Sequence, residues 1–140
     1  MTLRPASLLL CIAAALPATA QAKSYEIEDF SSAGLIDKAS VMSAWKEALP
    51  EARLVKLYPT ARWGFLSQVE GGVVDGTTCV VTARVTMLPK TAPTRRLVWE
   101  PNKSSTTYGA KLNASPADCT AFARTKLDEA LRSLVSSLVK

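Results

Sequence analysis

The sequence contains no histidine, and this absence narrows the chemistry that the protein can perform. Serine and cysteine triads use histidine as their base, and histidine is a principal zinc ligand, so both kinds of site are excluded. Gly71-Gly72 is no phosphate-binding loop or dinucleotide fingerprint, because it lacks the required spacing and a following helix. We therefore predict no metal, no cofactor and no catalytic residue, and we expect the protein not to be an enzyme.

Long apolar runs are also missing, except for one near the N-terminus. Arg4 precedes an apolar run over residues 8–16, which is short for a membrane span. Two overlapping cleavage patterns of small residues end at Ala20 and Ala22. Together these features predict a secretory signal peptide over residues 1–22, of an alanine-rich type that suggests a bacterial protein.

Two other interpretations of this leader remain open. The apolar run would also suit a membrane anchor or a buried helix, and Cys11 would suit a lipid-modified N-terminus. However, Cys11 follows Leu9 and Leu10, where a lipoprotein signal has small residues, and it lies within the apolar run. We expect Cys11 to be removed with the signal, and no transmembrane segment to remain afterwards.

Cysteine is scarce as well, and removal of the leader leaves only Cys79 and Cys119. An exported chain meets an oxidising compartment, where two thiols usually form a disulfide. A bridge across about 40 residues stabilises the folded state by about 4 kcal/mol in the loop-closure model. Two buried free thiols are the alternative, whereas a zinc site needs closer ligand spacing.

Basic residues outnumber acidic ones, and the excess is concentrated in one region. Arg4 is the one charge in the leader, so 16 of the 17 basic residues remain against 12 acidic ones. Residues 84–111 contain six basic residues and only Glu100 as an acid. This region is either a solvated basic face or a binding site for an anionic envelope ligand, a lipid head group or a polysaccharide, formed by Arg84, Arg95, Arg96 and Lys103. Nucleic acid is not expected, because the chain is predicted to be exported and its basic residues do not alternate with aromatic ones.

Residues 77–88 carry the clearest strand pattern in the chain. Alternate positions are apolar, and the intervening ones are mostly polar and include Arg84, so one side should be buried. Residues 62–70 have a similar pattern, with Ser67 as a polar exception on the apolar side. The pair Asp75-Gly76 predicts a turn that joins the two strands into a hairpin, with Gly71-Gly72 ending the first ladder.

Four further segments are short and less regular. Residues 23–30 suit an edge strand or an extended arm, and residues 53–58 are ambiguous between strand and helix. Residues 95–100 and 106–112 are predicted to be strands. The middle of the chain should therefore form an antiparallel sheet of three to five strands.

Two helices are predicted to flank these strands. Residues 37–49 have apolar residues at helical spacing, with Asp37 as the N-cap and Trp45 in the core. Residues 116–139 begin after the N-cap Ser115, and their apolar stripe includes Cys119. Because both remaining cysteines lie on apolar faces, the last helix should pack on the sheet and be bridged to it.

These patterns predict an α+β fold of two layers, with an antiparallel sheet covered on one face by an N-terminal and a C-terminal helix. Residues 23–140 should form one exported domain, periplasmic or secreted. The predicted function is binding, without catalysis, of another envelope or secreted protein. Binding of an anionic envelope ligand is the alternative. A small carboxylate-dependent hydrolase is a further alternative, although the acids Glu26, Glu28 and Asp29 are expected to be a solvated edge.

Overall fold

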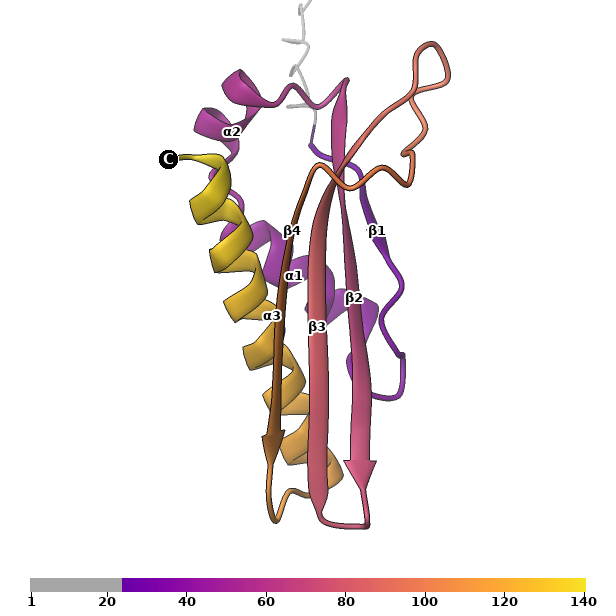
Figure 1. Cartoon of the computed structure of the whole chain (residues 1–140), viewed down its shortest axis with the longest axis vertical. Coiled ribbons are helices and arrows are strands. Elements are labelled where there is room, and N and C mark those ends of the chain that lie inside the picture. The colour runs from indigo at the N-terminus through magenta and orange to yellow at the C-terminus, as the bar shows by residue number, and fades with distance from the viewer. Residues whose placement is uncertain (1–23) are drawn as a thin grey trace, which may run out of the picture.

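The structure is a computed structural model that describes residues 24–140, arranged as a twisted sheet with helices on one face (Figure 1). The predicted signal peptide and Cys11 lie outside the described residues. The elements are β1 (Ile27–Asp29), α1 (Lys38–Ala48), α2 (Glu51–Leu57), β2 (Trp63–Val74), β3 (Thr78–Pro89), β4 (Lys103–Lys111) and α3 (Pro116–Leu138). The fold is therefore α+β, as predicted.

The predicted hairpin forms the centre of the four-stranded sheet, whose order is β1-β2-β3-β4. Strands β2 and β3 are antiparallel along their whole length, from Trp63 opposite Pro89 to Val74 opposite Thr78. Asp75 and Gly76 have positive φ angles of 50° and 72° at the turn. This backbone geometry suits a tight hairpin, because it follows the right-handed twist of the strands.

The sheet is mixed, and the prediction of a purely antiparallel sheet is wrong at the β1 edge. β1 pairs with β2 in parallel, with Ile27 opposite Phe65. The physical reason is the connection: residues 30–62 contain α1 and α2 and return the chain to the end where β1 began. Such a crossover makes neighbouring strands parallel, whereas a short turn would make them antiparallel.

Strand β2 also continues beyond the point where the sequence predicted its end. Gly71 and Gly72 pair with Val81 and Val80, so the ladder is not broken there. Their φ angles of 132° and 150° favour glycine. At Gly71 a Cβ atom would lie 1.9 Å from the Val80 carbonyl oxygen. The glycine pair therefore permits a close backbone approach within a continuous strand.

Residues 95–100 do not form the predicted strand. Pro93 and Pro101 lack the N–H that a ladder needs, and Arg95 has a positive φ of 54° that interrupts an extended run. One isolated bridge, between Lys90 and Leu97, joins this segment to the end of β3. Residues 90–102 instead form a long excursion between β3 and β4.

The helices cover one face of the sheet, called here the inner face. Side chains of β3 that point inward, such as Val81 and Val85, are fully buried. Helix α3 contributes a stripe of buried residues, namely Cys119, Ala123, Leu127, Ala130, Leu131, Leu134 and Leu138. Helix α1 adds Trp45, whose ring centroid lies 5.0 Å from that of Phe65. The ambiguous segment at 53–58 is helical, and its Leu54 is buried.

Helix α3 is held at both ends. The predicted disulfide joins Cys79 on β3 to Cys119 in the first turn of α3, with 5.4 Å between the Cα atoms. Ser115 forms the predicted cap, and its side chain and that of Asp118 make a reciprocal capping box. Near the other end, the Lys103 ammonium donates to the Ser137 carbonyl oxygen at 3.0 Å. This contact supplies a partner and a positive charge to the last turn.

Candidate functional site

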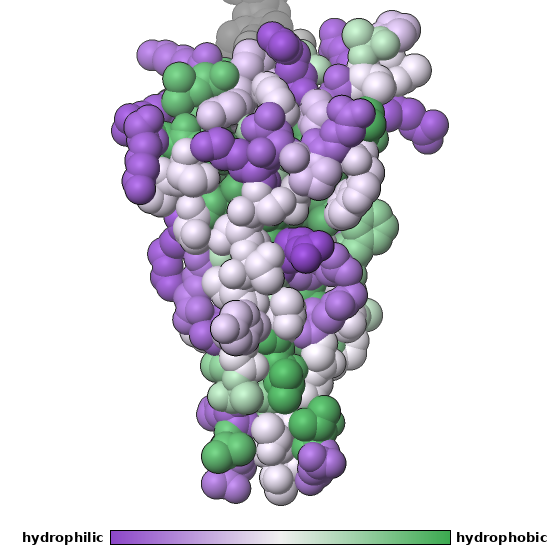
Figure 2. Space-filling view, in the orientation of Figure 1, coloured by the Kyte–Doolittle hydropathy of each residue, from purple (hydrophilic) through white to green (hydrophobic). Residues whose placement is uncertain are grey.

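The sheet face that points away from the helices is called here the outer face, and its side chains follow from the strand register. One cross-strand row contains Gln68, Arg84 and Thr106, and the next contains Glu70, Thr82 and Tyr108. Arg84, Glu70 and Thr82 are exposed, so no helix covers this part of the sheet. In Figure 2, hydrophobic groups also gather over the lower end of this face, around the β2–β3 turn.

The upper part of the outer face is covered by the excursion between β3 and β4. Leu66 and Leu88 lie on this face by register, and each is 2% exposed. The Leu97 side chain lies within 2.6 Å of where a Cβ atom of Gly64 would be, which places Leu97 over the same region. The excursion therefore closes a small second core and leaves the lower outer face open.

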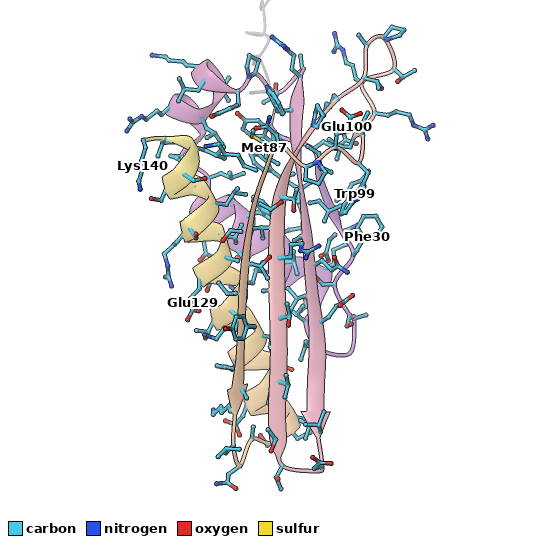
Figure 3. The ribbon with its side chains drawn as sticks, viewed as in Figure 1. Phe30, Met87, Trp99, Glu100, Glu129 and Lys140 are labelled. Atoms are coloured by element: carbon cyan, nitrogen blue, oxygen red, sulfur yellow. A yellow bond between two sulfur atoms is a disulfide. The ribbon has the colours of Figure 1, made fainter. Side chains whose placement is uncertain are left out.

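Three aromatic side chains are exposed on or beside the open face: Phe30 is 62% exposed, Trp99 60% and Tyr108 81%. Phe30 directly follows β1 and continues its register toward the Gln68 position on the outer face. In Figure 3, Phe30 and Trp99 lie on the side of the molecule where β1 forms the sheet edge. Aromatic residues with arginine are typical of the energetic centres of protein interfaces.

A shallow hollow of about 140 Å³ lies within the outer face, and its lining is Gln68, Glu70, Thr82 and Arg84. The Gln68 amide donates to a Glu70 carboxylate oxygen at 2.6 Å. Within residues 24–140, the Arg84 guanidinium forms no ion pair. Arg84 therefore presents a free cation at the centre of the exposed surface. We define the docking face as Phe30, Arg84, Trp99 and Tyr108.

The four basic residues predicted to bind an anion do not form one continuous surface. Arg84 lies on the outer face, and Arg95 and Arg96 lie on the exposed excursion. Lys103 is opposite Met87 on the inner side of the register, and its ammonium is bound to α3. Anion binding by this set of residues stays a prediction.

Other basic side chains of the same region take part in ion pairs. Lys90 lies 2.9 Å from a Glu26 carboxylate oxygen, and the Lys90 side chain is 9% exposed. Lys111 lies 3.2 Å from Asp118. Hydrogen bonds from Ser115, together with Lys111, lower the pKa of Asp118 from 3.8 to about 2. These two lysines are therefore structural partners of nearby carboxylates.

One pocket brings two acids together, which bears on the hydrolase alternative. It has a volume of about 200 Å³ and includes Glu47 of α1 and Asp128 of α3. Arg124 donates to both, at 3.0 Å to Glu47 and 2.9 Å to Asp128. Hydrogen bonds from Ser43 and Arg124 lower the pKa of Glu47. A general acid needs a raised pKa, so this arrangement suits an ion-pair link between two helices.

Of the acids predicted to form a solvated edge, Glu26, Glu28 and Asp29, two have structural partners. Glu26 binds Lys90, and Asp29 accepts hydrogen bonds from Ser31 and from the buried Ser67. The Ser67 bond explains why a polar residue occupies an apolar position. Within residues 24–140, no group of three or more cysteine, aspartate or glutamate residues has the geometry of a metal site.

The sequence patterns did not mark the exposed aromatic residues as functional candidates. Phe30 ends the predicted edge strand or arm at 23–30, Trp99 lies in the strand predicted at 95–100, and Tyr108 lies in the strand predicted at 106–112. No local signal marked Tyr108, because it alternates with Ala110 and Leu112 on the more apolar side of its segment, a pattern that suggests burial. Phe30 and Trp99 needed the three-dimensional arrangement of β1 and the excursion.

Comparisons with known proteins give weak similarities only. No protein-family model and no curated protein matches the chain. A solved Xanthomonas campestris protein of family DUF330 has 16% identity and a TM-score of 0.34, over 56% of this chain. The chain spans 45% of the length of that protein. The PelC dodecamer from Paraburkholderia phytofirmans has 13% identity and a TM-score of 0.40, over 69% of this chain and 71% of that one.

A third solved structure, described as a candidate lipoprotein from Caulobacter crescentus, has 12% identity and a TM-score of 0.35. It covers 79% of this chain and 82% of that one. Scores at this level carry no argument about function or assembly. Among residues 24–140, none of the helices combines the length and apolar character needed to cross a bilayer.

Proposed function

We propose that the protein is an exported, disulfide-stabilised binding protein that docks another envelope protein on its docking face. The observation that carries the proposal is the exposure of Phe30, Trp99 and Tyr108 on or beside the sheet face that bears the unpaired Arg84. Leaving large aromatic surfaces in water forgoes the stabilisation that burial would give, about 25 cal/mol per Å² of apolar area. A bound partner would recover that stabilisation.

The partner should carry an apolar surface with a carboxylate placed to meet Arg84. The Arg84 guanidinium has no ion-pair partner within the described chain, whereas Glu70 beside it is already bound by Gln68. A carboxylate from the partner would form a charge-assisted pair with Arg84 inside a rim of aromatic contacts. In this proposal the protein acts without catalysis.

Site-specific photo-crosslinking in the cells that make the protein tests this proposal. A benzophenone side chain at position 108 should give a discrete adduct with one protein partner. The same group at Ser133, which is exposed on α3, should give none. Equal yields at both positions, or no adduct at position 108, would overturn the proposal.

A second variant series links the adduct to the docking face. Trp99→Ser and Arg84→Gln should each reduce the adduct at position 108 at least fivefold. Leu57→Ser removes a similarly exposed apolar side chain from α2 and should leave the yield unchanged. If Leu57→Ser lowers the yield as much as Trp99→Ser does, the contact is non-specific and the docking face is wrong.

A further inference from the structure

A pocket separate from the docking face lies where β2 begins and β3 ends. Its volume is about 480 Å³, which is within the range of small-molecule sites. Figure 2 shows hydrophilic side chains gathered at this end of the molecule. The pocket lining consists of Ala61, Arg62, Lys90, Thr91, Ala92, Pro93 and Arg95.

Backbone hydrogen bonds hold the walls of this pocket in place. The Lys90 N–H donates to the Arg62 carbonyl oxygen at 2.8 Å, which joins the two strand ends. The Thr91 N–H donates to the Arg96 carbonyl, and the Arg95 N–H donates to the Thr91 carbonyl. Arg95 is thereby fixed on a closed turn, with a positive φ of 54°. The basic side chains start from anchored positions around the cavity.

The positive charge of the pocket is only partly compensated. Of its three basic residues, Lys90 is paired with Glu26. Arg62 and Arg95 are exposed, and neither guanidinium has an ion pair or a side-chain hydrogen bond with the side chains that the structure describes, those of residues 24–50 and 52–140. The three basic residues of the lining have one carboxylate partner, on Lys90, so the lining carries a surplus of about two positive charges.

We propose that this pocket binds a phosphate monoester, with Arg62 and Arg95 as the two anion-binding residues. A phosphate monoester carries a charge of about −1.5 to −2 at neutral pH, which matches the surplus. The planar guanidinium presents paired N–H donors whose spacing fits two phosphate oxygens. Lys90 is held in the pocket wall by its ion pair with Glu26. This inference goes beyond the docking proposal and shares no residue with the docking face.

Two sources of this group can be distinguished with two probes. Glycerol 3-phosphate, titrated by calorimetry into the mature protein, represents a free monoester. Vesicles of phosphatidylcholine containing phosphatidic acid represent a lipid monoester, with pure phosphatidylcholine vesicles as the blank. Saturable binding of either probe supports the site and identifies its source. Absence of binding to both probes would overturn the proposal.

Matched charge variants show whether the pocket itself is responsible. Arg62→Gln and Arg95→Gln should each weaken binding of the active probe at least tenfold, and their thermal midpoints should stay close to that of the parent because both side chains are exposed. Arg84→Gln removes the same charge from the docking face and should weaken binding less than twofold. Equal weakening by all three variants would mean attraction by net charge and would overturn the pocket. Photo-crosslinking at position 108 tests the docking proposal independently of these binding measurements. Either proposal can therefore be contradicted without the other.

Discussion

Successive side chains of β3 point to opposite faces of the sheet, and the two faces have opposite surroundings. Val81, Ala83 and Val85 point toward the helices and are 0% exposed, whereas Val80 is 40% exposed on the other side. Val80 and Val81 are chemically identical neighbours, so their burial is set by the register and not by residue type. The inner face therefore determines stability, whereas substitutions on the open outer face should leave the fold intact.

The strongest test of this comparison places the same charge on each face of β3. Val81→Asp should cost more than about 4 kcal/mol of unfolding free energy, because it buries an unpaired carboxylate in a packed core. Val80→Asp should lower the unfolding free energy by only about 1 kcal/mol, through loss of strand propensity at a partly exposed position. Urea denaturation followed by circular dichroism measures both values. Similar losses in the two variants would contradict the assignment of the faces.

Removal of the disulfide should have the next largest effect, because it ties the covering helix to the inner face. The bridge closes a separation of 40 residues in the sequence. Replacing both Cys79 and Cys119 by alanine should lower the unfolding free energy by about 4 kcal/mol in the loop-closure model. Denaturation of the variant and of the oxidised parent gives the difference. A loss under about 1 kcal/mol would mean that helix packing alone holds the inner face together.

A smaller effect is expected at the start of α3. The Ser115 side chain accepts a hydrogen bond from the Asp118 N–H at 3.1 Å, and loss of such a cap costs about 1 kcal/mol. Ser115→Ala should therefore lower the unfolding free energy by about 1 kcal/mol. Ser24→Ala, at an exposed position outside the helices and strands, is the matched control and should have almost no effect. Denaturation curves that coincide for Ser115→Ala and the parent would contradict a stabilising cap.

The smallest effect concerns pH at the same cap. The pKa of Asp118 is lowered from 3.8 to about 2, chiefly by hydrogen bonds from Ser115. The ionised carboxylate thus stabilises the folded state above pH 4, and this contribution disappears as the pH falls toward 2. Thermal midpoints of the parent and of Asp118→Asn should differ at pH 5 and converge near pH 2. A constant difference over this range would contradict the shifted pKa.

The sequence predicted the parts of the fold that depend on regular periodicity. The hairpin, the two capped helices and the Cys79–Cys119 bridge all arise from patterns repeated over many residues, and the structure confirms them. Ser67 stood out as a polar exception in such a pattern. Its buried hydroxyl donates to Asp29, a residue 38 positions away that periodicity cannot pair with it.

The remaining features depend on contacts between distant segments. The parallel pairing of β1 follows from the path of residues 30–62, which no local pattern in β1 records. Residues 95–100 have strand-like composition, but the flanking prolines and the left-handed Arg95 remove their pairing partners. Likewise, the four basic residues predicted to bind an anion lie apart, because Lys103 is on the inner side of the sheet and binds α3. The candidate pocket could not be predicted from the sequence, because it depends on Arg62 lying beside Lys90, and these residues belong to the ends of two different strands.

The two attachments of α3 have a mechanical consequence. Near the lower end of the helix a covalent bond fixes it to β3, and near the upper end a lysine from β4 holds its last turn. Helix α3 therefore cannot shift along its axis or move away from the sheet without breaking either the disulfide or the Lys103–Ser137 hydrogen bond. Amide hydrogens of α3 and of the inner strands should consequently exchange with deuterium as one cooperative unit, later than those of the excursion at 90–102.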